Sequence, residues 1–427
     1  MSDKGDGRTA NGSTGAVTPV AAPPAAAPAT IVAPRAEDAT PRSLSRFLSL
    51  ADFETAARRA LPRQIYGYYA GAAETSQSFQ GNFAAFRQYD LVPRVLTDVS
   101  SRSTRAKLFG MDYWAPFGIA PMGLSGLATF DGEIALARAA SAANIPSIVS
   151  ATSLTPLERI AQEGRARWFQ AYLPGEDARI EAMVARVQAA GYDTFVLTAD
   201  VPVAANRENN VRTGFSIPLQ PSLRLAWDGL SHPRWLCRTW FATLLSRGVP
   251  HFENMDAFRG PPILARNVVR AIGARDQLAW RHLALIRRLW PGRLVVKGIL
   301  SPADAVLARE NGADGIIVSN HGGRQLDGAR PPLLALPEIA EVSGSMAVML
   351  DGGIRRGSDV LKALALGADF VFVGRPFLFA AAARGEAGVS HAIALLVAEI
   401  ERNMALLGVS RIEDVGAAHV ERSPFPR

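Results

Sequence analysis

Cysteine, lysine and long apolar runs are all scarce in this chain of 427 residues. Cys237 is the single cysteine, so no disulfide can form within the chain, as is common in a reducing compartment. No uncharged apolar run approaches the roughly 18 residues of a membrane-spanning helix. No Gly-x-Gly-x-x-Gly motif opens a β-α-β unit, so a dinucleotide-binding fold is not indicated. We therefore expect a cytoplasmic protein without a transmembrane helix.

Lysine occurs at four positions, Lys4, Lys107, Lys297 and Lys362, although the net charge is +7. Arginine thus carries nearly all the positive charge, and the arginines are spread along the chain. A nucleic-acid-binding surface would concentrate them in a stripe. The pattern favours a general avoidance of lysine, and we expect no nucleic-acid partner.

The first 42 residues are rich in Ala, Pro, Gly, Ser and Thr, and six prolines between Pro19 and Pro41 interrupt any helix. Such a composition predicts a disordered tail. A signal peptide, with Lys4 and Arg8 as its basic start, is the alternative, but prolines fall where its apolar segment should lie. Residues 43–427 form the predicted globular domain.

Eight short β-branched or apolar runs follow, separated by stretches with helical periodicity. The predicted strands are Phe117–Ala120, Ser147–Ser150, Trp168–Tyr172, Thr194–Thr198, Arg293–Lys297, Gly315–Ser319, Ala347–Leu350 and Asp369–Val373. The clearest helices are Gly132–Ala143, Ala178–Ala190, Pro302–Asn311 and Gly357–Leu366. Eight strand–helix units in one chain predict an α/β fold, the closed parallel TIM (β/α)8 barrel, over an open doubly wound sheet.

One connection is far longer than the others, because the fourth strand starts at Thr194 and the fifth at Arg293. The excess, about residues 212–285, is an insert at the C-terminal face, where barrels place their active sites. Four of the chain's seven tryptophans lie in it, and three of them, Trp227, Trp235 and Trp240, lie among several arginines. A basic, aromatic insert can lie on a membrane surface. A lid over the substrate and an oligomer contact are the alternatives.

The segment Ser319–Asp327 has the strongest chemical pattern. It follows the apolar strand residues Ile316–Val318, where barrel enzymes place catalytic side chains. His321 can act as a general base near neutral pH, and Arg324 offers a planar fork for a carboxylate. Gly322 and Gly323 permit the tight turn that directs both inward. A base and a carboxylate clamp at one strand end predict catalysis.

Two further ionisable residues end predicted strands. Lys297 follows Leu294–Val296, and a lysine there is costly unless it meets negative charge; a solvated strand end is the alternative. Because arginine is the default cation of this chain, a compact ammonium suggests a role such as neutralising a reduced flavin. Asp200 ends the fourth strand and could orient His321, or it could cap a helix.

Glycine-rich loops follow the last two strands, at Asp351–Arg356 and at Gly374–Pro376. In barrels these two loops form the usual phosphate cradle, with backbone N–H groups and arginine as donors. A flavin-free barrel acting on a phosphorylated metabolite would also use them, but it leaves His321, Arg324 and Lys297 unexplained. A non-catalytic scaffold would be expected to lose one of those three residues.

Four segments together resemble the FMN-dependent L-2-hydroxy acid dehydrogenase/oxidase family: Tyr66–Glu74, Val296–Gly298, Ser319–Asp327 and Asp351–Arg356. The resemblance covers about residues 44–415. Among family members it is nearest to the membrane-associated mandelate and L-lactate dehydrogenases, including His232–Trp235 of the insert. It implies FMN as cofactor and oxidation of an L-2-hydroxy acid to the 2-oxo acid.

The resemblance also implies residue roles. His321 is the implied catalytic base with Asp200 as its partner, and Tyr172 bonds the substrate oxygen. The substrate carboxylate is held by Arg324, Arg207 and Tyr68. The implied FMN contacts are Pro121, Met122, Gly123, Ser150, Gln170, Thr198, Lys297 and Ser319 near the ring, and Asp351, Gly353, Arg355, Gly374 and Arg375 at the ribityl chain and phosphate.

Departures from the family pattern concern substrate size. Met122 stands where many members have threonine, and Gly123 where oxidases generally have alanine and mandelate dehydrogenase glycine. Thr152 replaces the tryptophan of glycolate oxidase and leaves room for a larger side chain, which favours an aromatic or medium-sized acid over glycolate. Asn206 replaces the first of two arginines, but Arg207 keeps the second. The expected electron acceptor is a quinone or a protein carrier, with O2 and release of H2O2 as the alternative. By analogy with the family, we also expect the insert to contact the inner face of the plasma membrane and the chain to form a homotetramer.

Overall fold

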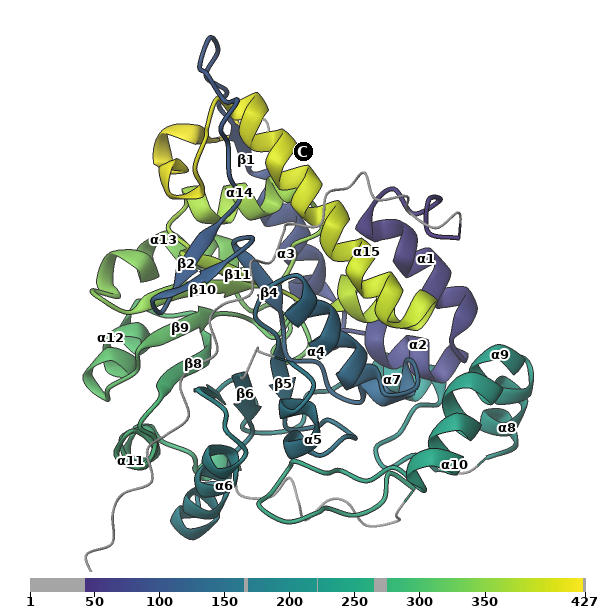
Figure 1. Ribbon diagram of the computed structural model, residues 1–427. Helices are drawn as coiled ribbons and strands as arrows, with labels where there is room; N and C mark the ends of the chain where they lie inside the picture. Colours follow the sequence, from purple (N-terminus) through teal and green to yellow (C-terminus); the bar gives the residue numbers. More distant parts are fainter. Residues whose placement is uncertain (1–42, 165–167, 221, 265–274, 425–427) are drawn as a thin grey trace, which may run out of the picture. The chain divides into compact units, whose positions relative to one another are not determined.

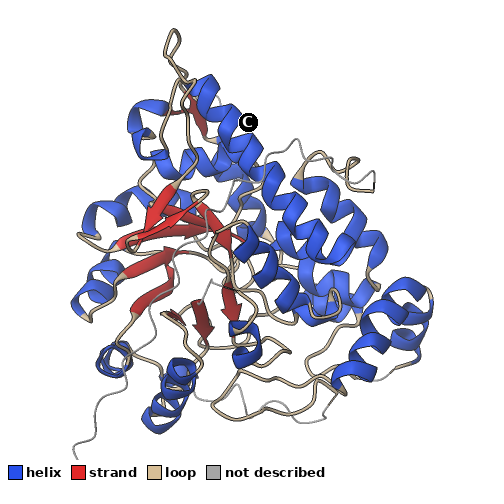
Figure 2. Cartoon of the chain, in the orientation of Figure 1, coloured by secondary structure: helices blue, strands red, loops and turns tan. Residues whose placement is uncertain are grey.

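The computed structural model describes residues 43–164, 168–220, 222–264 and 275–424, and the predicted tail lies outside them. Eight parallel strands form the central sheet (Figures 1 and 2), in the order β4-β11-β10-β9-β8-β7-β6-β5. Their bounds are β4 Phe117–Ile119, β5 Ile148–Ser150, β6 Trp168–Ala171, β7 Thr194–Thr198, β8 Arg293–Ile299, β9 Gly315–Val318, β10 Ala347–Asp351 and β11 Phe370–Val373. A bridge between Ile119 and Ser147 joins the two ends of this order, which makes a nearly closed barrel.

Helices surround the strands, as Figure 2 shows. They are α4 Gly132–Ala142, α5 Leu157–Ala161, α6 Asp177–Ala189, α11 Trp280–Leu289, α12 Pro302–Glu310, α13 Pro332–Val342, α14 Gly357–Ala365 and α15 Arg375–Leu407. Most strand residues are buried on both faces, because one face lies inside the barrel and the helices cover the other. The predicted barrel is thus confirmed, and each predicted strand matches an observed one to within about two residues.

The segments before the barrel add three helices, α1 Leu50–Ala60, α2 Arg63–Ala70 and α3 Gln77–Arg87. Helix α1 packs against α15, and α2 brings Tyr68 to the C-terminal mouth of the barrel. A hairpin of β2 Ala106–Leu108 and β3 Met111–Tyr113 covers the opposite mouth, where the ring of Phe109 contacts Trp168 at the start of β6. Strand β1 Tyr89–Leu91 pairs with the late strand β12 Val420–Arg422.

The long connection after β7 contains α7 Glu208–Thr213, α8 Leu223–Leu230, α9 Pro233–Trp235, a π-helical stretch Leu236–Phe241 and α10 Ala242–Arg247. Its helices α8, α9 and α10 lie beside one another in Figure 1. Helix α11 packs against α6 and α12. None of the described helices is both long enough and apolar enough to cross a bilayer.

The tryptophans of this insert do not share one environment. Trp235 is 8% exposed, donates from its indole nitrogen to the Leu127 carbonyl, and stacks on Trp240. Trp227 is 74% exposed. The indole N–H of Trp235 thus finds its partner on the barrel side, and this tryptophan is not available to an outside surface.

Candidate active site

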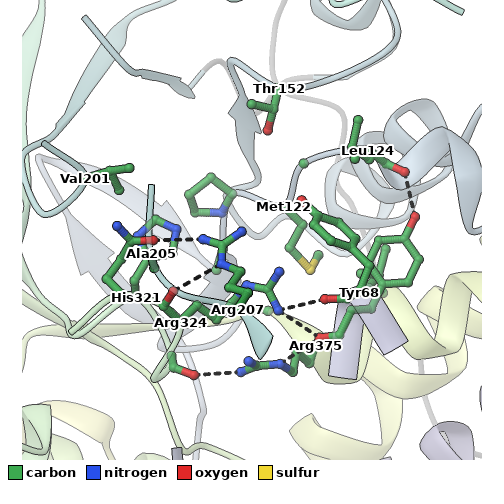
Figure 3. A pocket seen from close by; sticks show the side chains of 18 of the residues that line it. Tyr68, Met122, Leu124, Thr152, Val201, Ala205, Arg207, His321, Arg324 and Arg375 are labelled. Carbon is green, nitrogen blue, oxygen red and sulfur yellow. Dashed lines mark hydrogen bonds between the residues drawn. The ribbon is translucent and has the colours of Figure 1, made fainter. Parts of the chain in front are cut away.

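A cavity of about 570 Å³ opens at the C-terminal ends of the strands. Its wall includes fourteen of the predicted site residues: Tyr68, Pro121, Met122, Gly123, Tyr172, Arg207, Lys297, His321, Arg324, Asp351, Gly353, Arg355, Gly374 and Arg375. Figure 3 shows several of them converging from different elements. The other five, Ser150, Gln170, Thr198, Asp200 and Ser319, do not form its wall. The structure thus gathers at one mouth of the barrel residues that lie more than 300 positions apart.

His321 is held between two partners. Its Nδ1 lies 3.0 Å from Asp200 Oδ1, and its Nε2 lies 3.3 Å from the Tyr172 hydroxyl. The His321 backbone is left-handed, with φ of 57°, and Gly322 and Gly323 continue the turn at positive φ. Such a conformation is uncommon for a residue with a side chain and is typical of functional sites. The turn predicted from the two glycines is present.

The charges around His321 favour a neutral imidazole paired with a carboxylate. Burial lowers the pKa of His321 below its usual 6.5, although Asp200 opposes this. Burial raises the pKa of Asp200, but His321 and Lys297 outweigh it and hold that pKa below its usual range. Burial raises the pKa of Tyr172 to about 12. A neutral imidazole with a charged partner on its far nitrogen can accept a proton.

Two guanidinium groups face the same cavity (Figure 3). Arg324 Nη1 donates to the carbonyls of Tyr68 and Gly71, and Arg207 Nε donates to the Arg324 carbonyl. Burial and then Arg207 lower the pKa of Arg324 to about 10. Neither arginine forms an ion pair within the described residues. Two neighbouring cations without a carboxylate form an anion site.

Lys297 is buried at 3% exposure, and its Nζ lies 2.7 Å from Ser319 Oγ and 3.0 Å from Asp351 Oδ2. Burial lowers the pKa of Lys297, but Asp351 and Asp200 outweigh it and raise that pKa. The ammonium therefore stays charged. The sequence predicted a negative charge beside Lys297 but did not identify Asp351 as its source. The signal was present, because Lys297 and Asp351 both lie near strand ends at one mouth of the barrel.

The five residues outside the wall lie behind it. Ser150, Gln170, Thr198 and Ser319 are each at most 4% exposed. Gln170 Oε1 accepts from Ser150, but Gln170 Nε2, Thr198 Oγ1 and Asp351 Oδ1 find no partner among the described residues. Buried polar atoms rarely remain unpaired. These atoms fit a polar, planar ligand such as the isoalloxazine ring of FMN, which would occupy the strand ends.

The other end of the cavity is cationic. Burial lowers the pKa of Arg355, and burial followed by the charges of Arg324 and Arg355 holds that of Arg375 well below its usual value. Neither Arg355 nor Arg375 makes an ion pair within the described residues. Gly353 has φ of 87°, and a side chain there would lie 2.6 Å from the Asn82 carbonyl. Two partly buried guanidinium groups beside a turn that only glycine fits are suited to the phosphate of FMN.

Gly123 and Thr152 contact each other at the cavity wall. A β-carbon on Gly123 would lie 2.0 Å from Thr152 Oγ1. Thr152 Oγ1 is also 3.0 Å from Ser150 Oγ, which restrains it. The two departures noted in the sequence are therefore one spatial feature, since glycine makes room for threonine.

The structure adds a cavity residue that sequence reasoning missed, Arg275 of the insert. Its Cζ lies 4.6 Å from the ring centroid of Tyr172. No local pattern marks it, because it is one arginine among many in a long connection. Asn82 is a second omission: it exchanges side-chain hydrogen bonds with Asn320 and so braces the His321 turn against α3.

Comparison with known proteins agrees with this geometry. Residues 57–422 match the family described as FMN-dependent dehydrogenase. An L-lactate dehydrogenase of Stenotrophomonas maltophilia (strain R551-3) is 40% identical over 370 residues, covering 86% of this chain and 96% of that protein. The structure of the monotopic membrane protein (S)-mandelate dehydrogenase is similar at a TM-score of 0.81 and 35% identity, over 88% of this chain and 100% of that one. A mandelate oxidase structure is similar at a TM-score of 0.71 and 36% identity, over 86% of this chain and 97% of that one.

The match to the family extends over most of the chain, and these relatives are covered along nearly their whole length. On these grounds the chain belongs to the FMN-dependent dehydrogenase family.

Proposed function

We propose that this enzyme oxidises a lactate- or mandelate-like L-2-hydroxy acid to the 2-oxo acid with bound FMN. One observation carries the proposal: the imidazole of His321, the guanidinium groups of Arg207 and Arg324, and the ammonium of Lys297 all face a single cavity. A general base, a carboxylate site and a buried charge for the cofactor are the parts that this reaction requires. Relatives named as lactate and mandelate dehydrogenases support the choice of substrate class.

FMN supplies the two-electron acceptor of this reaction when it is bound. In the proposal its ring is held by Pro121, Met122, Gly123, Ser150, Gln170, Thr198, Lys297 and Ser319, and its ribityl chain and phosphate by Asp351, Gly353, Arg355, Gly374 and Arg375. The unpaired buried atoms of Gln170 and Thr198 support the first group. The unpaired charges of Arg355 and Arg375 support the second.

The substrate is positioned by its carboxylate, which binds Arg207 and Arg324 beside the ring of Tyr68. Tyr172 then donates its hydroxyl hydrogen bond to the substrate oxygen, since its high pKa keeps it protonated. His321 Nε2 takes one proton from the substrate. Asp200 stabilises the imidazolium that results and keeps Nδ1 as the donor.

Anaerobic mixing with L-lactate, L-mandelate and glycolate tests the reaction. We expect loss of the visible flavin absorbance with at least one of the larger two acids, followed by turnover with a dye acceptor. His321→Gln should abolish the rapid phase and leave the bound flavin unchanged. A purified protein without flavin, or a flavin that no 2-hydroxy acid reduces, would contradict the proposal.

The proposed electron acceptor is a membrane quinone or a protein carrier. Gly123, shared with mandelate dehydrogenase in the resemblance, supports a dehydrogenase. Similarity to mandelate oxidases keeps O2 as the second candidate. Stopped-flow mixing of the reduced enzyme with air separates the two, because rapid reoxidation with release of H2O2 would identify an oxidase.

The insert presents an apolar surface that suits peripheral membrane contact. On α8, Leu223, Trp227 and Leu230 are 92%, 74% and 64% exposed and lie at helical spacing on one face. Leu245 on α10 is 87% exposed. Arginines beside such a face favour an anionic lipid surface. We place the enzyme in the cytoplasm, in contact with the inner face of the plasma membrane.

Co-sedimentation with vesicles tests the membrane proposal. Binding should require anionic lipid and should fall at least tenfold in Trp227→Glu, whereas Leu326→Glu, a change at another exposed apolar residue, should bind as the unmodified enzyme does. Equal binding by both variants would exclude α8 as the contact. Sedimentation velocity would test the homotetramer that the resemblance predicts.

A further inference from the structure

Arg275 is a buried cation that the proposed reaction does not use. Its side chain lies in the cavity wall, 9% exposed, with its Cζ 4.6 Å from the centroid of the Tyr172 ring. Tyr172 in turn contacts His321, and the two rings stack with centroids 6.3 Å apart. Arg275 and His321 therefore both contact the Tyr172 ring.

No described residue supplies an anion to Arg275. Within the part of the chain that the structure describes, it makes no ion pair and its Nη2 is buried without a hydrogen-bond partner. Asp256 and Glu176, the acidic groups near Arg179, are both bonded to that arginine. Burial lowers the pKa of Arg275; Tyr172 opposes this shift, and the charge of Arg179 adds to it. A buried guanidinium donor without an acceptor is costly, and a ligand that supplies one removes the cost.

The other cations of the cavity all have an assigned anion. Lys297 pairs with Asp351, while Arg355 and Arg375 face the proposed phosphate and Arg207 and Arg324 the proposed carboxylate. Phe252 and Met255, which also line the cavity from the insert, offer no side-chain acceptor that carries charge. In the substrate complex, Arg275 is then left as a positive charge in a largely apolar surrounding.

We propose that Arg275 binds a second carboxylate at the far end of the substrate, so that the preferred substrates are L-2-hydroxy dicarboxylic acids. The first carboxylate binds Arg207 and Arg324, the hydroxyl group lies at His321 and Tyr172, and a side chain of one or two methylene groups carries the second carboxylate toward Arg275. This inference rests on the proposed reaction, the oxidation of an L-2-hydroxy acid, and replaces the lactate- or mandelate-like side chain of the preferred substrate with one that carries a carboxylate. It makes Arg275 a specificity-determining residue.

Substrate pairs that differ only in the second carboxylate test the inference. We would measure kcat/KM with a dye acceptor for L-malate against L-2-hydroxybutanoate, and for L-2-hydroxyglutarate against L-2-hydroxypentanoate. The unmodified enzyme should favour the dicarboxylic acid in at least one pair. In Arg275→Met that ratio should fall roughly 10- to 150-fold, the effect of one charge-assisted hydrogen bond. The ratio in Arg275→Lys should lie between those of the unmodified enzyme and of Arg275→Met.

The ratio within a pair cancels effects that Arg275 exerts through Tyr172, because both acids of a pair use Tyr172 alike. Arg281→Met, the same change at an exposed arginine of α11, should leave the ratio unaltered. If Arg275→Met does not fold, binding of 2-oxoglutarate and 2-oxopentanoate to the unmodified enzyme, followed by the flavin spectrum, replaces it. This pair of 2-oxo acids should show the same preference for the acid with two carboxylates.

Two outcomes overturn the inference: no preference for the dicarboxylic acid in the unmodified enzyme, or an unaltered ratio in Arg275→Met. Both leave the proposed function intact as long as the monocarboxylic acids reduce the flavin. Failure of every 2-hydroxy acid to reduce it contradicts the proposed function instead.

Discussion

Replacing Asp200 with asparagine tests the contact on which proton transfer depends. Asp200 Oδ1 lies 3.0 Å from His321 Nδ1, and both side chains are largely buried. The change keeps the size and one acceptor oxygen of the side chain but removes its charge. The imidazolium that forms when His321 accepts a proton then lacks its counter-charge.

The structure sets the size of the effect. At an effective dielectric constant of about 20, two unit charges at this separation attract by about 5 kcal/mol. The amide oxygen retains part of this as a neutral hydrogen bond of about 1 kcal/mol. We therefore expect a loss of about 4 kcal/mol, which corresponds to a roughly 10³-fold slower step.

The assay is anaerobic stopped-flow reduction of the flavin by substrate across the acidic pH range. Asp200 raises the pKa of His321, so its removal should move the acidic limb of the rate profile to lower pH while the plateau falls. A structural defect alone would lower the plateau without that shift. A substrate deuterated at its hydroxyl-bearing carbon should report that the chemical step limits the rate.

Asp177→Asn is the matched control, because Asp177 is exposed on α6 and pairs with Arg281. This variant should leave both the rate of flavin reduction and its pH profile unchanged. A plateau within tenfold of the unmodified enzyme in Asp200→Asn, or an acidic limb that moves to higher pH, would refute the role given to this carboxylate.

Three other predictions follow from the same geometry. Because burial lowers the pKa of His321 below 6.5, kcat/KM of the unmodified enzyme should be constant near neutral pH and should fall, through the binding of one proton, only below about pH 6.5. A value of kcat/KM that rises toward acidic pH would contradict a neutral base. Arg355→Leu should weaken FMN binding roughly 10- to 150-fold, measured by equilibrium dialysis, yet leave riboflavin binding unchanged, since only FMN carries the phosphate. Equal losses of affinity for both ligands would show that Arg355 does not bind the phosphate. Gly123→Ala forces its new methyl group against Thr152 Oγ1, so kcat/KM should fall at least tenfold, and Thr152→Gly in the same chain should restore part of it; additive losses would show that the two positions do not interact.

The barrel could be predicted because each of its parts has a local signal. Runs such as Ile316–Val318 and Phe370–Val373 are apolar on both faces, and the stretches between strands have helical period. The sites at strand ends could be predicted for a related reason. Parallel strands end at one mouth, so His321, Lys297 and Asp200 were expected to meet there before any distance was known.

Other features were decided only by the tertiary structure. Lys297 and Asp351 pair across the mouth, Arg275 returns from a long insert to the Tyr172 ring, and Gly123 makes room for Thr152. Trp235 turns inward while Trp227 stays at the surface. The sequence by itself determines the period of each element and the chemistry at its ends. Which side chains then touch depends on packing between residues far apart in the chain, and on which buried polar atoms find partners, neither of which has a local pattern.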